Sequence, residues 1–495
     1  MRALRTAWIA ALVMAGVLAF PAHANKNASP LSPELRKAVR AAEAIFERGD
    51  PGTSAIAMEA VASHADFGAL EASERSAYLL RAAWLATEAR DMPRAHRLAQ
   101  AAVDAEGNDP DAWFLLGQLA ADQGQDETAA RALAHLASTW PALVGHLRTE
   151  LVNPLLHRLG VTSPQTLELL EALYAADWTV DGIEPDHAWA RLALMRADRG
   201  DHDGARAALA GVTSATVITW LRSDRRFDAL IKRDDPRYEP RKAAAAEVDT
   251  LRGRAAGSPS SLALQRELAY SLLVAGRPGE ALALAEQALA DPGRFDDTDD
   301  LHWMANQRAI ALRRLSRTDE ALAALTAAAA MDESGQANVS QTLNLGTLLV
   351  DMERPEQALA AIARVDGMSG YGLLVQSMVR LRAYRQMGRD DDAAIWLQRI
   401  RDGRDEGTIL HLEALLLAGH EDEAANWLAE LLDDPDRRAE ALAWCQDYLG
   451  SEPLAGRVPL REARASLLAR SDVLAAVNAV GRIEDTGIHD TVGID

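Results

Sequence analysis

The chain has 495 residues, a formal net charge of −21, one cysteine, and a composition that is 48% hydrophobic but only 5% aromatic. So acidic a chain is poorly suited to bind nucleic acid or anionic membrane surfaces, both of which favour a basic protein. Because one cysteine cannot form an intrachain disulfide, packing must supply the stability. Segments rich in Ala and Leu, with little polar–apolar alternation, predict an all-α fold.

The N-terminal residues predict export. Two arginines precede an apolar run over residues 7–20, and Ala22-His23-Ala24 has the small-x-small pattern of a cleavage site. We therefore expect residues 1–24 to be a signal peptide and the mature protein, with a net charge of −23, to be periplasmic or secreted. A retained N-terminal anchor is the alternative, but the run is too short to span a bilayer. No later segment predicts stable membrane insertion.

Residues 110–143 form the most regular segment of the sequence. Asp109 and Pro110 suit a helix start, because an Asp caps free N–H groups and proline fits the first helical position. Small residues then occur where two helices would cross closely. The signature positions are Trp113, Leu116, Gly117, Gly124, Ala129 and Pro141. They resemble the tetratricopeptide repeat (TPR), a helical hairpin of about 34 residues.

Weaker copies of this pattern recur along the chain, each identified by the alanine of its second helix. These alanines are Ala95, Ala205, Ala281, Ala321, Ala358, Ala393 and Ala424. A glycine precedes several of them by five residues, as Gly124 precedes Ala129. A poorly matched hairpin around Gly49 is expected to cap the N-terminal end. The chain thus resembles the TPR superfamily, as in exported bacterial TPR proteins, over about three quarters of its mature length.

The resemblance implies a right-handed α-solenoid of TPR-like helical hairpins in two consecutive arrays. The segment from Trp220 to Pro240 breaks the periodicity and resembles segments that close TPR arrays. We therefore divide the mature chain into an N-terminal array over residues 30–242 and a C-terminal array over 243–482, joined by a helix that includes the alanine run at Ala243. Residues 483–495 have no apolar periodicity, so we expect a mobile tail.

The sequence carries no pattern typical of catalysis. It has no phosphate-binding glycine loop, no G-x-S-x-G elbow, no H-E-x-x-H helix and no paired CxxC motifs. The acidic loop Asp291–Asp300 could supply oxygen ligands to calcium, but it lacks the EF-hand order and favours a solvated turn. Cys445 is expected to be buried and inert. We therefore predict no enzyme activity, no cofactor and no metal site.

The leading functional hypothesis is an exported scaffold that binds a peptide or protein partner in the concave groove of its solenoid. The alternative is an accessory subunit of envelope polysaccharide or secretion machinery that recognises an anionic glycan. An enzyme with appended repeats is a third class, but helical hairpins leave it no room. A peptide pull-down and a glycan array would separate the first two.

The predicted partner-binding residues occupy first-helix positions that normally face the groove. They are Arg266, Asn306, Arg313, Arg314, Arg382 and Arg385. This basic stripe resembles the grooves of peptide-binding TPR domains that hold acidic C-termini, and guanidinium groups would bind such a ligand by charge-assisted hydrogen bonds. The alternative is that these arginines are solvated and cover apolar side chains with their stems. Arg308 and Arg380 stand where leucine is usual, which leaves the register of the repeats at Ala321 and Ala393 open.

Overall fold

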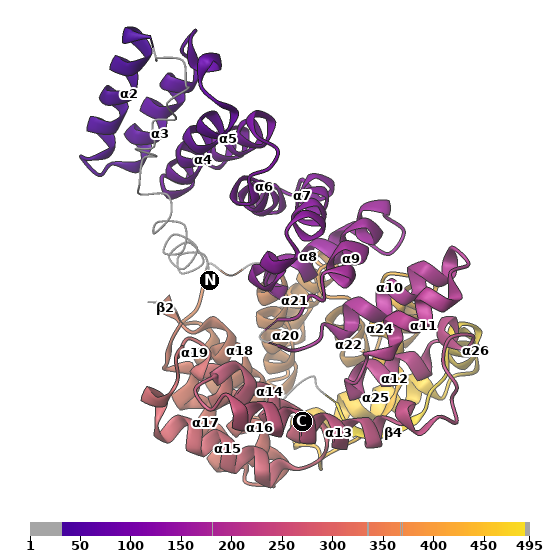
Figure 1. Cartoon of the computed structure of the whole chain (residues 1–495). Helices are drawn as coiled ribbons and strands as arrows, with labels where there is room; N and C mark the ends of the chain where they lie inside the picture. The colour runs from indigo at the N-terminus through magenta and orange to yellow at the C-terminus, as the bar shows by residue number, and fades with distance from the viewer. Residues whose placement is uncertain (1–31, 181, 334–335, 367, 369, 491–495) are drawn as a thin grey trace. The chain divides into compact units, whose positions relative to one another are not determined.

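The computed structural model describes residues 32–490, except residues 181, 334–335, 367 and 369 (Figure 1). The described chain is an all-α solenoid of successive helical hairpins with a few short strands, which confirms the predicted fold class. It divides into two compact units between Met195 and Arg196, inside α10 (Asp186–Asp198). The predicted signal peptide lies outside the described residues. Within the described part of the chain, no helix has the length and apolar character to cross a bilayer.

The first unit consists of hairpins joined by short turns. Its helices before α10 are α2 (Pro33–Phe46), α3 (Pro51–Ala62), α4 (Ala72–Glu88), α5 (Met92–Ala105), α6 (Pro110–Asp122), α7 (Asp126–Thr139), α8 (Thr149–Leu159) and α9 (Pro164–Ala175), with short 3-10 turns η1 (Phe67–Ala69) and η2 (Pro141–His146). Asp109 caps α6 as predicted, since its side chain accepts hydrogen bonds from the N–H groups of Asp111 and Ala112. At the crossing of α6 and α7, a Cβ atom added to Gly117 would first meet the side chain of Leu133, at 2.7 Å, so this crossing requires a small residue.

The second unit continues the hairpins and adds a C-terminal segment. Its helices are α11 (His202–Ala210), α12 (Ala215–Ser223), α13 (Pro240–Gly257), α14 (Leu262–Val274), α15 (Pro278–Ala290), α16 (Leu301–Arg314), α17 (Thr318–Ala329), α18 (Val339–Asp351), α19 (Pro355–Ile362), α20 (Gly370–Gln386), α21 (Asp390–Asp402), α22 (Thr408–Leu417), α23 (Glu421–Asp433), α24 (Arg438–Cys445), α25 (Val458–Leu468) and α26 (Ser471–Val480). Short 3-10 turns and strands link them: η3 (Arg225–Phe227), η4 (Pro236–Tyr238), η5 (Pro292–Arg294), η6 (Ala455–Arg457), β1 (Asp332–Glu333), β2 (Gln336–Ala337), β3 (Asp447–Leu449) and β4 (Asp485–His489).

The predicted junction between the arrays lies between α12 and α13 of this unit. Residues 224–239 form a loop with η3 and η4, and the alanine run at Ala243 lies in α13. The compact division falls earlier than the array boundary at 242/243, because α11 and α12 pack with the second unit. The array boundary follows the repeat pattern and stays a prediction.

The alanines that identify the repeats all lie in second helices and are at most 3% exposed. They are Ala95, Ala129, Ala205, Ala281, Ala321, Ala358, Ala393 and Ala424. Their burial confirms the hairpin positions, including the two repeats whose register the sequence left open. A larger side chain at such a position would separate the paired helices.

The turn inside each hairpin adopts the same left-handed backbone conformation. In all eight repeats, the residue five positions before the second-helix alanine has a positive φ, between 55° and 82°. Five of these residues are glycines, for which this conformation costs little. The other three are Arg90, Ser316 and Glu353, where a Cβ atom opposes it. The turn geometry is therefore set by the hairpin even where glycine is absent.

Successive first helices of the second unit contact one another from α14 through α16, α18 and α20 to α22, whereas no pair of successive second helices does so extensively. The first helices therefore form the inner face of this array, as Figure 1 lets the reader follow from α14 to α20. This is the arrangement that the TPR resemblance implies.

The C-terminal residues differ from the expected mobile tail. Residues 485–489 form β4, which pairs in parallel with β3 and packs against α13. Ile488 is fully buried and Thr486 is 3% exposed. Local periodicity could not reveal this order, because its partners lie far away in the sequence. Residues 491–495 lie outside the described part of the chain.

Candidate functional site

The predicted partner-binding residues lie on first helices, as expected from the repeat pattern. Arg266 is on α14, Asn306, Arg313 and Arg314 are on α16, and Arg382 and Arg385 are on α20. The inner face is nevertheless covered in part by the C-terminal segment of the same chain.

Three of the predicted arginines hold that segment by its main chain. Arg313 donates a hydrogen bond from Nη2 to the carbonyl oxygen of Glu452. Arg382 donates to the carbonyl oxygen of Gly456 at 3.0 Å and also pairs with the carboxylate of Asp351. Arg314 donates to the carbonyl oxygen of Asp490 at 2.9 Å. These guanidinium groups thus contact polypeptide backbone, and the backbone is the chain's own.

The other predicted residues have different surroundings. Arg266 pairs with Asp300 at 2.7 Å and with Glu267 at 3.4 Å, while burial raises the pKa of Glu267. Asn306 accepts a hydrogen bond from the side-chain amide of Asn344 at 3.2 Å. Arg385 is exposed near the end of α20. A role in partner binding stays a prediction for all six residues.

The contact of η6 with α18 requires a glycine at position 456. A Cβ atom added to Gly456 would overlap the main-chain oxygen of Val350 and lie 2.8 Å from the side-chain amide nitrogen of Gln386. That amide already donates to the Val350 oxygen at 2.7 Å. Because the obstacle is backbone rather than a flexible side chain, it cannot easily move aside.

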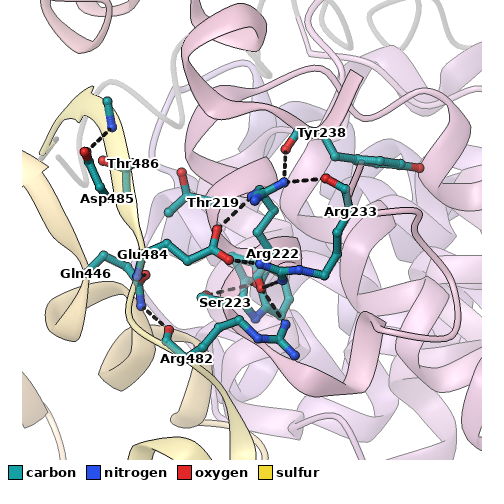
Figure 2. Close-up of polar contacts among 12 residues, drawn as sticks. Thr219, Arg222, Ser223, Arg233, Tyr238, Gln446, Arg482, Glu484, Asp485 and Thr486 are labelled. Atoms are coloured by element: carbon teal, nitrogen blue, oxygen red, sulfur yellow. Dashed lines mark hydrogen bonds and ion pairs between the residues drawn. The ribbon is translucent and has the colours of Figure 1, made fainter. Parts of the chain in front are cut away.

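A network of ion pairs joins the C-terminal segment to the end of α12 and the loop after it (Figure 2). The carboxylate of Glu484 accepts from Nε of Arg222 at 2.7 Å and from the guanidinium of Arg233. Arg482 binds both carboxylate oxygens of Asp228, at 2.8 and 2.6 Å. Hydrogen bonding to Arg482 is the main reason why the pKa of Asp228 is lowered. Three ion pairs therefore connect residues 251 to 262 positions apart.

Backbone contacts strengthen the same junction. The N–H of Arg482 donates to the carbonyl oxygen of Ser223 at 2.9 Å, and Asp224 and Gly481 form an isolated antiparallel bridge. A Cβ atom on Gly481 would lie only 2.6 Å from that same Ser223 oxygen. The C-terminal segment is thus fastened to the end of α12 and to the loop that follows it. We call this set of contacts the closure junction.

A pocket of about 230 Å³ lies between the inner face and the C-terminal segment of the second unit. Its walls come from the end of α16, β3, the loop over residues 450–453, α25 and the end of β4. Five arginines line it: Arg313, Arg314, Arg457, Arg461 and Arg464. Burial, followed by the charge of Arg314, lowers the pKa of the neighbouring His489 to about 4. We call this space the arginine pocket.

Three of the pocket arginines were missed at the level of sequence, although a signal was present. Arg461 and Arg464 lie three residues apart on α25, and Arg457, four residues before Arg461, is the N-cap of that helix, so a helical pattern places all three on one side. The signal was weak because α25 does not belong to a repeat, so no register indicated which way this face points.

The described residues show no arrangement typical of metal binding or of a reactive thiol. No group of three or more His, Cys, Asp or Glu side chains there could hold a metal ion. Burial raises the pKa of the Cys445 thiol to about 12, so the thiol stays protonated at neutral pH. In the acidic loop, Asp300 pairs with Arg266 and Asp296 accepts from the Ser260 hydroxyl at 2.5 Å.

Comparison with known proteins identifies no family for this chain. No model of a protein family matches this sequence, and no curated protein matches it. Among solved structures, it is similar to one described as the "Crystal structure of APC/C hetero-tetramer Cut9-Hcn1", with 13% identity, 83% of this chain and 87% of that chain covered, and a TM-score of 0.29. So distant a likeness carries no argument about function, which must come from the chain's own geometry.

Proposed function

We propose that this protein is an exported, non-enzymatic scaffold that binds a protein partner on the inner face of its second unit. Helical hairpins account for most of the described chain, and stacked hairpins present extended faces suited to elongated ligands. The export part of the proposal comes from the signal-peptide pattern of residues 1–24.

The observation that carries the proposal is how the inner face holds the chain's own C-terminal segment. Arg313 and Arg382 donate to main-chain carbonyl oxygens, which every polypeptide offers whatever its sequence. The surface is therefore chemically suited to hold extended polypeptide. The residue through which it would reach a separate protein is Arg385, which is exposed near the end of α20.

A guanidinium group at this position favours a partner that presents carboxylates. Charge-assisted hydrogen bonds to a carboxylate are stronger than neutral ones and can be bidentate. Because an exposed contact is screened by salt, binding should weaken as ionic strength rises from about 0.05 to 0.5 M. We therefore propose an acidic partner surface.

Site-specific photo-crosslinking in intact cells tests the proposal. A photoreactive residue at position 385 should capture one discrete envelope protein, whereas the same residue at position 399 should not. Arg399 is the matched control, because it is also an exposed arginine but lies on α21, the second helix of the same hairpin. Equal capture from both positions, or none from position 385, would contradict binding at this face.

Export is tested separately by N-terminal sequencing of the protein recovered from the envelope fraction. The mature chain should begin at Asn25. Recovery of the uncut chain in membranes would overturn the export proposal and leave the binding proposal standing.

A further inference from the structure

We propose that the arginine pocket binds a small ligand that carries a carboxylate or phosphate group. This inference goes beyond the scaffold function and does not depend on it. The pocket adjoins the inner face through Arg313 and Arg314, but most of its walls come from β3, the following loop and α25, so it differs from a groove formed by first helices alone.

Arg313 is the main reason to expect an anion in this pocket. Arg313 is only 4% exposed, and its Nε atom has no hydrogen-bond partner among the described residues. Within the described chain its side chain donates one hydrogen bond, to the Glu452 main-chain oxygen, and no described carboxylate lies within ion-pair distance. A buried guanidinium without a counter-charge is costly, and a bound oxyanion would offset that cost.

Arg382 provides an internal comparison. It is buried to the same degree, at 5% exposed, and also donates to a main-chain oxygen of the C-terminal segment. Unlike Arg313, it pairs with a buried carboxylate, that of Asp351. The fold therefore supplies a counter-charge where the surroundings are filled, and lacks one where the pocket lies.

Arg464 adds a second positive charge at the pocket wall. Its guanidinium donates to the carbonyl oxygens of Trp444, at 2.6 and 3.2 Å, and of Gln446, at 2.8 Å. No carboxylate of the described chain forms an ion pair with it. These carbonyl contacts fix the orientation of the group, so two preoriented guanidiniums, those of Arg313 and Arg464, face the same space.

The remaining walls limit the size and body of the ligand. The volume corresponds to roughly eight water molecules at about 30 Å³ each, the size of a small carboxylic acid or phosphate ester. Trp444, Tyr448 and Leu460 provide aromatic and apolar contacts for its body. Four acidic residues also line the pocket, beside the five arginines: Glu413, Asp447, Glu452 and Asp490. Glu452 turns its main-chain oxygen to Arg313, and Glu413 accepts from the Trp444 indole at 3.4 Å. None of these carboxylates forms an ion pair with Arg313 or Arg464 in the described chain.

Calorimetry on the full mature chain tests this inference with inorganic phosphate and benzoate as probes, each against chloride at matched ionic strength. At least one probe should bind saturably, and the choice between them identifies the oxyanion. Arg313→Met, which removes the buried charge but keeps much of the side-chain volume, should weaken binding at least tenfold. Absence of saturable binding by both probes would overturn the inference.

Two further variants guard against loss of folding and against non-specific binding. Arg461→Ala changes an exposed residue at the rim of the pocket and should weaken binding about threefold to tenfold while the thermal transition stays unchanged. Arg399→Ala removes the same charge from α21, outside the pocket, and should bind as the wild type does. Equal affinity in Arg461→Ala and wild type, or equal weakening in both alanine variants, would show that the pocket is not the site.

Discussion

The closure junction gives the sharpest test of how the second unit is stabilised. Replacing Glu484 by glutamine keeps the shape of the side chain and removes its charge. We predict that Glu484→Gln lowers the free energy of unfolding of the second unit by about 1 to 3 kcal/mol. The second unit should unfold at a lower urea concentration, and the backbone amides at the closure junction should exchange faster.

The magnitude follows from the surroundings of the carboxylate. Hydrogen bonds to charged groups contribute about 1.5 to 3 kcal/mol and neutral ones about 0.5 to 1.5, so weakening two of them costs about 2 kcal/mol. The side chains of Glu484, Arg222 and Arg233 are 17%, 20% and 35% exposed. Water therefore screens the pair in part, and the loss should stay below the roughly 3 to 5 kcal/mol of a fully buried pair.

Hydrogen exchange measured by mass spectrometry locates the effect. Peptides covering residues 220–238 and 481–489 should exchange faster together, while peptides of the first unit should be unchanged. Glu462→Gln is the matched control, because it makes the same chemical change on an exposed position of α25. If the junction peptides of Glu484→Gln exchange at the wild-type rate, the carboxylate does not fasten the segment and the reasoning fails.

Three further predictions concern packing, turn geometry and pH. Gly456→Ala should destabilise the second unit by about 1 to 3 kcal/mol in urea unfolding because its methyl group meets the Val350 carbonyl, whereas Gly450→Ala, with open space around it, should have little effect. Ser316→Gly should raise the stability by roughly 0.5 to 1 kcal/mol by relieving a φ of 61°, and the reverse change Gly388→Ser should lower it; equal midpoints would refute this. Burial lowers the pKa of His411 from 6.5 to about 4, so the stability gained by keeping it neutral is complete above pH 6.5 and is lost as the pH falls from 6.5 to about 4. His411→Gln should therefore lose less stability than the wild type between pH 7 and 4.5.

The hairpins were predictable because their determinants are local. An alanine at a helix crossing and a turn residue five positions earlier lie within one repeat, so their spacing survives in the sequence as a pattern. The structure shows that the left-handed residue of the turn is not always a glycine. Ser316 and Glu353 take the same left-handed conformation, since the paired helices on either side impose it.

The closure junction could not be predicted in the same way, because nothing local distinguishes its members. Glu484 lies in a stretch without apolar periodicity, and the arginine that it binds, Arg222, precedes it by 262 residues. Many arginines and carboxylates occur in this chain, so the sequence offers too many equivalent pairings to choose from. Only the backbone contact beside the pair, where Gly481 meets Ser223, restricts the choice, and it becomes visible only after folding.

The groove arginines illustrate the same limit at the level of function. Their positions on first helices follow from the repeat, and their chemistry favours acceptor oxygens, as the sequence predicts. Which acceptors they meet does not follow, because a carbonyl oxygen of the chain's own segment satisfies a guanidinium as a ligand would. Arg382 has both a main-chain oxygen and a carboxylate, whereas Arg313 has a main-chain oxygen and an adjoining pocket. The missing counter-charge, rather than the presence of an arginine, is therefore what distinguishes a candidate binding position from a structural one.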